Sequence, residues 1–207
     1  MPNAMVIDLS HHNANDDFQR IRAAGVVGVI HKATQGTGFV DDKYAPRKPA
    51  ALAAGLLWGA YHFGTGDGVD AQVSHFINTV QPDGSFVLVL DFEKNTTPPM
   101  NSMSLDQAKQ FLTAVEQQTG QKPVLYTGSF LTDTCGSAAI PDLAQYRVWW
   151  ARYSNTPHLH ATWPSFWLWQ YTDGQNGQPV KSVDGVGPCD CNTFTGDEAA
   201  LRQRWLA

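Results

Sequence analysis

The sequence has few cysteines, no long apolar run and no excess of basic residues. Its three cysteines, Cys135, Cys189 and Cys191, are too few for a disulfide framework, although one bridge from Cys135 to either partner stays open. No run approaches the 18 apolar residues of a transmembrane helix, so we expect no membrane insertion. The formal net charge of −5 gives no reason to expect nucleic acid or an anionic membrane as a partner.

The N-terminal segment MPNAMVIDLS lacks a basic stretch followed by an apolar one, so no signal peptide is visible. This is compatible with a cytosolic protein, with release by lysis or another route, or with a sequence given without its leader. No internal repeat or low-complexity linker divides the 207 residues. We therefore expect a single domain spanning residues 1–207, and a monomer.

The chain alternates between strand patterns and helix patterns. Apolar runs, several of which end in polar residues, predict strands, and 3.6-residue periodicity between caps predicts helices. Ser104-Leu105-Asp106-Gln107 is a capping-box pattern, which predicts a helix start with Ser104 as N-cap. The predicted strands are 5–10, 26–33, 57–63, 86–93, 123–127, 147–151, 166–171 and 190–194. The predicted helices cover about 16–25, 43–54, 70–80, 105–120 and 196–206, with a loop at 34–38 and weak helical pieces in 128–146.

This order predicts an α/β fold with mostly parallel strands. Most of eight strands fit a small, irregular (β/α) TIM-like barrel better than an open sheet. Such barrels place their active sites at the C-terminal ends of the strands. The predicted strand ends carry polar side chains: Asp8, His31, His62, Asp91, Glu93, Arg152 and Gln170.

Asp91 and Glu93 follow the most apolar of these runs, Phe86–Leu90. Side chains alternate along a strand, so both carboxylates point to one side and Phe92 to the other, with the two Cα atoms roughly 6.6 Å apart. Two acids at the end of a buried strand are costly unless they are paired, solvated or used. Glycoside hydrolysis uses such a pair, although two solvated acids in a loop are the simpler interpretation.

Asp8 also ends an apolar run, Val6-Ile7-Asp8. Alone it could form an Asx turn. Together with Asp91 and Glu93, it predicts a shared acidic pocket in which crowding moves the carboxyl pKa values apart, as an acid and a base require.

Histidines near strand ends raise the alternative of a metal site. His11, His12, His31 and His62 could join Asp8 in binding zinc or another divalent ion, but their spacing matches no tight metal motif. Cys189-x-Cys191 is likewise too sparse for zinc. Ser10 lies near the histidines, yet no G-x-S-x-G elbow is present. We expect neither a metal nor a cofactor.

Aromatic residues crowd the C-terminal third. They predict core and barrel wall for about half the set and stacking faces for sugar rings for the rest. Trp167 and Trp169 must face opposite to Leu168 and Gln170, but which pair faces the lumen stays open. The set is Trp149, Trp150, Tyr153, Trp163, Trp167, Trp169 and Tyr171.

Seven short motifs, in order along nearly the whole chain, resemble glycoside hydrolase family 25, the Chalaropsis-type lysozymes. They are VIDLS at 6–10, KATQG with FVD at 32–41, GAYHF at 59–63, DFE at 91–93, WARY at 150–153, WQY at 169–171 and DCNTF at 190–194.

The resemblance implies cleavage of the β-1,4 bond between N-acetylmuramic acid and N-acetylglucosamine in peptidoglycan, outside the cell or in the periplasm. It implies that Glu93 is the catalytic acid and that Asp91 orients the substrate's 2-acetamido group, which serves as nucleophile. The remaining carboxylates of the implied active site are Asp8 and Asp190. The implied substrate contacts are Lys32, Gln35, Tyr61, His62, Trp150, Arg152, Tyr153 and Gln170.

Two positions depart from the family pattern. Gln35 stands where the family usually has glutamate, and His31 where it usually has an apolar or aromatic residue. Asp184 rivals Asp190 as the fourth carboxylate, but lacks the N-x-F sequence that follows Asp190.

Three alternative functions remain beside the muramidase. The first is a catalytically weak glycan-binding module, which an intact D-x-E motif disfavours. The second is a metal-dependent hydrolase using Asp8, His31 and His62. The third is a chitin-type glycan hydrolase using the same acetamido chemistry.

Overall fold

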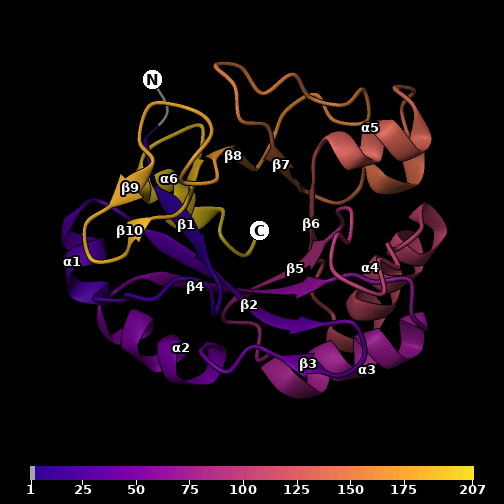
Figure 1. Cartoon of the computed structure of the whole chain (residues 1–207), viewed down its shortest axis with the longest axis horizontal. Coiled ribbons are helices and arrows are strands. Elements are labelled where there is room, and N and C mark those ends of the chain that lie inside the picture. Colours follow the sequence, from indigo (N-terminus) through magenta and orange to yellow (C-terminus); the bar gives the residue numbers. More distant parts are fainter. Residues whose placement is uncertain (1–2) are drawn as a thin grey trace.

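A computed structural model describes residues 3–207, so residues 1 and 2 of the predicted 1–207 domain lie outside the described residues. Eight strands close into a barrel, because β1 pairs with β2 on one side and with β11 on the other (Figure 1). The barrel predicted from the sequence is confirmed.

The elements follow the predicted order. The barrel strands are β1 (Val6–Leu9), β2 (Gly28–Gln35), β4 (Leu57–Phe63), β5 (Val87–Asp91), β6 (Val124–Thr127), β7 (Val148–Ala151), β8 (Leu168–Thr172) and β11 (Asp190–Thr193). Three two-residue strands lie outside it: β3 (Phe39–Val40), β9 (Ser182–Val183) and β10 (Gly187–Pro188). The helices are α1 (Phe18–Ala23), α2 (Tyr44–Ala53), α3 (Val69–Val80), α4 (Leu105–Thr119), α5 (Ser129–Cys135), a 3₁₀ turn at Pro141–Leu143 and α6 (Glu198–Gln203).

Strand direction departs from an all-parallel barrel at one place. The neighbours from β1 through β8 run parallel, whereas β11 is antiparallel to both β1 and β8. The first residue of β11 therefore lies at the barrel end where the other strands finish. Asp190 is that residue and pairs with Asp8.

Alternation along the strands divides the core into two apolar clusters. In β5, Val87 and Val89 belong to the cluster inside the barrel, and Leu88 and Leu90 to the cluster between barrel and helices. Because both faces are buried, the strand reads as one continuous apolar run.

Helices α1 to α4 pack outside β1 to β6, whereas long loops cover the barrel between β7 and β11 (Figure 1). The predicted capping box at the start of α4 is confirmed: Gln107 N–H donates to Ser104 Oγ, and Ser104 N–H to Gln107 Oε1. Such local signals explain why the early helices are readable from sequence.

The predicted loop at 34–38 is corrected. β2 continues to Gln35, and the chain turns through Gly36, which has φ +54°, into β3. Residues 34 and 35 then pair with β3, so the turn forms a short hairpin beside the barrel mouth. β5, by contrast, ends at Asp91, two residues before the predicted end.

The structure also bears on the expectations for membrane insertion and for cysteine pairing. None of the helices described between residues 3 and 207 is long and apolar enough to cross a membrane. Cys135, Cys189 and Cys191 are all free, so the bridge left open from Cys135 is not formed.

Candidate active site

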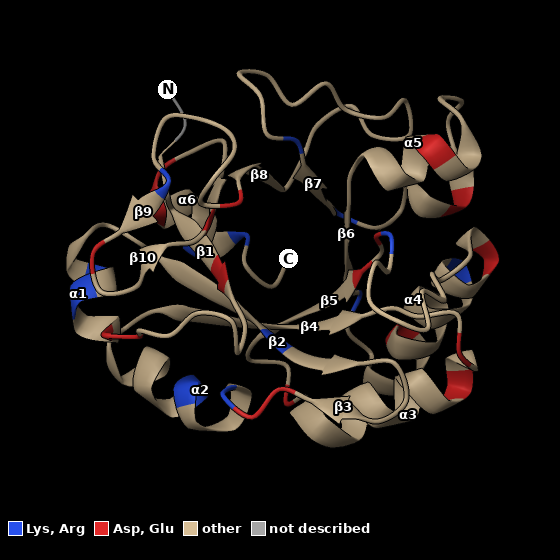
Figure 2. Cartoon of the chain, viewed as in Figure 1, with Lys and Arg blue, Asp and Glu red and all other residues tan. Residues whose placement is uncertain are grey.

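A pocket of about 540 Å³ opens at the barrel end where the parallel strands finish. Figure 2 shows acidic segments of β1 and β5 and a basic segment of β2 around this centre. The pocket is lined by Asp8, Ser10, His11, His12, Lys32, Gln35, Phe39, Tyr61, Phe63, Asp91, Glu93, Lys94, Asn95, Thr96, Thr97, Tyr126, Trp149, Tyr153, Gln170 and Asp190.

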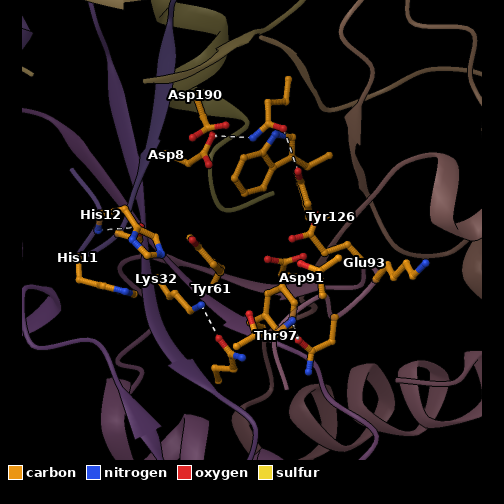
Figure 3. Close-up of a pocket in the computed structure, with 18 of the residues that line it drawn as sticks. Asp8, His11, His12, Lys32, Tyr61, Asp91, Glu93, Thr97, Tyr126 and Asp190 are labelled. Atoms are coloured by element: carbon orange, nitrogen blue, oxygen red, sulfur yellow. Dashed lines mark hydrogen bonds between the residues drawn. The ribbon is translucent and has the colours of Figure 1, made fainter. Parts of the chain in front are cut away.

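The four predicted carboxylates meet in this pocket. Asp8 and Asp190 lie together on one side, and Asp91 and Glu93 on the other (Figure 3). Asp8 and Asp91 come from strand ends, whereas Glu93 lies two residues beyond β5. Three separate parts of the chain therefore place their acids around one cavity.

Asp8 is held by two amide groups. Gln170 Nε2 donates to Asp8 Oδ2 at 3.0 Å, and Asn192 Nδ2 donates to the same oxygen at 2.8 Å. Burial raises the pKa of Asp8 to about 6, and these two hydrogen bonds offset part of that rise.

The amide orientation of Gln170 is fixed by two phenols. Tyr126 and Tyr153 both donate their hydroxyl groups to Gln170 Oε1, at 2.8 and 2.9 Å. The oxygen is thereby committed to the tyrosines, and the NH₂ group must face Asp8. The tyrosines thus orient a carboxylate that they do not touch.

Asp91 has a buried oxygen without a hydrogen-bond partner. The residue is 6% exposed, and the oxygen without a partner is Oδ1. Burial raises the pKa of Asp91 well above its usual range, Glu93 raises it further, and Lys32 acts in the opposite direction. The side chain is therefore ready to accept a hydrogen bond from a ligand.

Glu93 is half-buried at the pocket wall. Burial raises its pKa to about 7; the Lys32 charge lowers the pKa and Asp8 raises it. A carboxyl group with this pKa is largely protonated at mildly acid pH and can act as a general acid.

Asp190 completes the set from the antiparallel strand. Burial raises its pKa well above the usual range, and Asp8, its partner in the strand pair, adds to the rise. Its rival Asp184 is exposed and paired with Arg20 outside the pocket. The geometry therefore favours Asp190 over Asp184.

The remaining predicted contacts divide into two groups. Lys32, Gln35, Tyr61, Tyr153 and Gln170 line the pocket. Burial raises the pKa of Tyr61 well above its usual range, so this hydroxyl stays protonated and can donate.

The other three predicted contacts lie outside the pocket, which corrects their expected role. His62 is fully buried between barrel and helices, and its ring stacks on Phe111. Trp150 is 3% exposed and faces the same outer layer. Arg152 is exposed, but it lines a neighbouring hollow beside α5. Strand alternation explains His62 and Trp150, because each is adjacent in sequence to a residue that faces the lumen, whereas Arg152 lies just beyond the end of β7.

The metal interpretation loses two of its four histidines for the same reason, whereas His11 and His12 line the pocket. His31 and His62 face away from Asp8, on the outer side of the barrel wall. Over residues 3–207, no group of three or more His, Cys, Asp or Glu side chains is arranged to hold a metal ion.

The expected division of the aromatic residues is confirmed only in part, because two of the seven line the pocket and Trp167 does not face the same way as Trp169. Trp149 and Tyr153 line the pocket. Leu168 and Gln170 belong to the lumen and Trp169 to the outer layer, whereas Trp167, just before β8, packs on Trp205 inside the barrel. The remaining members, Trp150, Trp163 and Tyr171, are core residues of the outer layer.

Sequence reasoning assigned no role to two residues that shape the pocket, Tyr126 and Asn192, and included Trp149 only in the aromatic set. Tyr126 lies near the end of β6, two residues after the lumen residue Val124, and therefore faces the same side; this is the signal that could have found it. Trp149 donates its indole N–H to Asn192 Oδ1 at 2.6 Å, which turns the Asn192 NH₂ group toward Asp8. The role of Asn192 depends on the direction of β11, for which the sequence holds no local signal.

Comparison with known proteins gives a consistent picture. The family model of the glycosyl hydrolases family 25 matches residues 7–179. Lysozyme M1 of Streptomyces globisporus is 27% identical over 208 residues, covering 94% of this chain and 69% of that protein. The N,O-diacetylmuramidase of Chalaropsis sp is 27% identical, covering 86% of this chain and 95% of that protein. The crystal structure of a bacterial lysozyme from Streptomyces coelicolor superposes with a TM-score of 0.82 at 28% identity, covering 94% and 93% of the two chains.

Proposed function

The chain belongs to the glycosyl hydrolases family 25 and is a glycoside hydrolase, and we propose that it is a peptidoglycan muramidase. Its substrate would be the β-1,4 bond between N-acetylmuramic acid and N-acetylglucosamine. The observation that carries the proposal is the pair Asp91 and Glu93, a hydrogen-bond acceptor without a protein partner beside a carboxyl group of pKa about 7.

Glu93 is the proposed general acid. Its proton passes to the glycosidic oxygen as the bond to the sugar C1 breaks, so the leaving sugar departs as a neutral alcohol. The raised pKa supports this role, because the carboxyl group must carry its proton near neutral pH.

Asp91 is the proposed partner of the 2-acetamido group. The acetamido oxygen attacks C1 as the leaving group departs. The N–H of the same acetamido group donates to the Asp91 carboxylate, which stabilises the positive charge on the ring that this attack closes. The Glu93 carboxylate then takes a proton from water, and the resulting hydroxide attacks C1 and releases the acetamido group with net retention. The unpartnered Oδ1 of Asp91 supports this assignment.

Asp8 and Asp190 are proposed to supply negative potential on the opposite side of the pocket. There they would stabilise the oxocarbenium-like charge at the sugar ring. The two amides on Asp8 hold that carboxylate still, so little reorganisation is needed when the charge develops.

The protein would act where peptidoglycan is exposed, outside the cell or in the periplasm. We further propose that residues 1–207 act as one catalytic domain and as a monomer. Size-exclusion chromatography with light scattering would test the oligomeric state, and a dimer mass would contradict it.

Mass spectrometry of the products from purified peptidoglycan tests the reaction. We expect muropeptides with N-acetylmuramic acid at the reducing end, and none from the Glu93→Gln variant, which should melt no lower than the wild type. Reducing-end N-acetylglucosamine would contradict the bond assignment. Binding without cleavage would favour the glycan-binding module, and cleavage of chitooligosaccharides at a similar rate the chitin-type hydrolase.

A further inference from the structure

Lys32 is a buried cation that the protein leaves largely unpaired. Its side chain lines the active-site pocket and is 8% exposed. Nζ donates one hydrogen bond, to Gln35 Oε1 at 2.6 Å. Within residues 3–207, no carboxylate oxygen lies within 4.0 Å of this ammonium group.

Two aromatic rings hold the ammonium group in place. Nζ lies 4.9 Å from the centre of the Phe63 ring and 5.5 Å from that of Phe39. The ring faces attract the positive charge, but they do not accept N–H hydrogen bonds as a carboxylate would. An ammonium group has three donors, and Gln35 accepts from one of them. Two donors therefore remain for a ligand in the pocket.

Burial makes the charged form of Lys32 unfavourable while no ligand is bound. Burial lowers the pKa of Lys32, and the nearby charges of Asp91, Asp41 and Glu93 offset that effect from beyond salt-bridge distance. A ligand that brings an anionic oxygen or a carbonyl oxygen to Nζ would restore the interactions that burial removed.

The proposed substrate offers one group of this kind on every second sugar. This step rests on the proposed muramidase function. Both sugars carry an acetamido group, whereas only N-acetylmuramic acid carries a lactyl ether. The lactyl group ends in a carboxylate on a bare strand, or in an amide carbonyl where a stem peptide is attached.

The charge of the pocket singles out Lys32 as the partner for that group. Among the described lining residues, Lys32 and Lys94 are the only lysine or arginine side chains, and Lys94 is exposed. We propose that Lys32 binds the lactyl carboxyl oxygen of N-acetylmuramic acid and so distinguishes muramyl glycans from chitin-type glycans.

Binding measured in the Glu93→Gln background tests the proposal, because cleavage and the titration of Glu93 are then absent. Calorimetry compares a peptide-free tetrasaccharide of alternating N-acetylglucosamine and N-acetylmuramic acid with chitotetraose. We expect Lys32→Met to weaken binding of the muramyl tetrasaccharide about tenfold or more, as for loss of a charge-assisted hydrogen bond. Binding of chitotetraose should change by less than about twofold, since it lacks the lactyl group.

Lys94→Met is the matched control, because it removes an exposed lysine from the same pocket and should change neither affinity by more than about twofold. A peptide-bearing muramyl ligand should show a smaller loss in Lys32→Met than the bare one, since its lactyl carbonyl is neutral. Equal loss for the muramyl and chitin ligands, or no loss for either, would overturn the proposal. Melting temperatures of all variants exclude misfolding as the cause.

Hydrolysis by the wild-type protein is assayed separately. If peptidoglycan is not cleaved but the muramyl ligand still depends on Lys32, the proposed function fails and the recognition stands. If cleavage occurs without that dependence, the recognition fails and the muramidase stands.

Discussion

Lys32 and Tyr61 face the inside of the barrel, whereas their chain neighbours His31 and His62 face the surrounding helices. All four lie on β2 or β4 near the mouth, and all four were candidates for the same site. The two histidines are neutral and hydrogen-bonded on both ring nitrogens, whereas Lys32 keeps donors free and Asp91 beside it keeps an oxygen without a partner.

Both outer-face histidines have hydrogen-bond partners on both ring nitrogens. His62 donates from Nε2 to Gln72 Oε1 at 3.1 Å and accepts at Nδ1 from Thr34 Oγ1 at 2.7 Å. This assignment follows because the Gln72 NH₂ group donates to two backbone carbonyls, which leaves its oxygen as an acceptor. Burial lowers the pKa of His62 to about 3, so the ring is neutral and needs no counter-charge.

His31 follows the same rule. Its Nδ1 donates to the Lys32 carbonyl at 2.6 Å, and its Nε2 accepts from Arg47 Nη1 at 3.0 Å. Burial lowers its pKa to about 4. The adjacent guanidinium of Arg47 also bonds to Asp16 and to the carbonyls of Ser10 and Asn13.

The inner face buries acids whose charged form the folded protein disfavours. Burial raises the pKa of Asp8 to about 6 and that of Glu93 to about 7, and Asp91 keeps an oxygen without a partner. Unsatisfied polar groups of this kind are typical of sites that bind or react. Four predictions could break or sharpen this contrast between the two faces.

The largest expected effect is on the outer face. Arg47→Met removes a buried guanidinium, leaves His31 Nε2 and the Asp16 carboxylate without their partner, and takes one of two donors from the carbonyls of Ser10 and Asn13. We expect a loss of about 3–5 kcal/mol in the free energy of unfolding, measured by urea denaturation. Arg20→Met, which breaks an exposed pair with Asp184, is the control and should leave the unfolding midpoint nearly unchanged. Equal unfolding midpoints for the two variants would contradict a stabilising role for the hydrogen bonds of Arg47.

On the inner face the expected loss is in turnover. Asp91→Asn keeps the shape but removes the negative charge beside the reacting sugar, and kcat should fall by about 10²–10³-fold. His62→Gln, its counterpart on the outer face, should keep kcat of the folded protein within about threefold and lower the melting temperature instead. Muropeptide release and thermal unfolding, measured on both variants, check the pair. A reversed pattern would contradict the division.

A smaller effect concerns stability at alkaline pH. The folded pKa of Glu93, about 7, lies above its ordinary value of 4.5, so the folded state binds more protons than the unfolded chain between these values. The contribution of Glu93 to stability is therefore present below pH 4.5 and is lost as pH rises through 7. Glu93→Gln removes this loss, and we expect it to be more stable than the wild type at pH 8 by on the order of 1–3 kcal/mol. Calorimetry at pH 4 and pH 8 measures the difference, which should shrink toward zero at pH 4.

The smallest expected effect is a shift of the pH profile. The basic limb of kcat/KM should lie near pH 7, where Glu93 loses its proton. Because the Lys32 charge lowers the pKa of Glu93, Lys32→Met should move this limb to higher pH. His62→Gln should leave it in place, since His62 faces away from the pocket and its pKa is about 3. A downward shift in Lys32→Met would contradict the assignment of the limb to Glu93.

Local patterns in the sequence determined much of this protein. Apolar runs predicted the barrel strands, the Ser104 capping box predicted the start of α4, and the placement of Asp8 and Asp91 at strand ends predicted an acidic pocket. These signals depend on residues close together in the chain, where alternation and capping act directly.

Only the tertiary structure decided which polar residues belong to the pocket. Strand alternation predicts that Tyr61 and His62 point to opposite faces, but closure of the barrel determines which one faces the lumen. The antiparallel direction of β11 brings Asp190 to the mouth, because its first residue meets the ends of the parallel strands. Residues far apart in the chain meet there, and no local pattern encodes that contact.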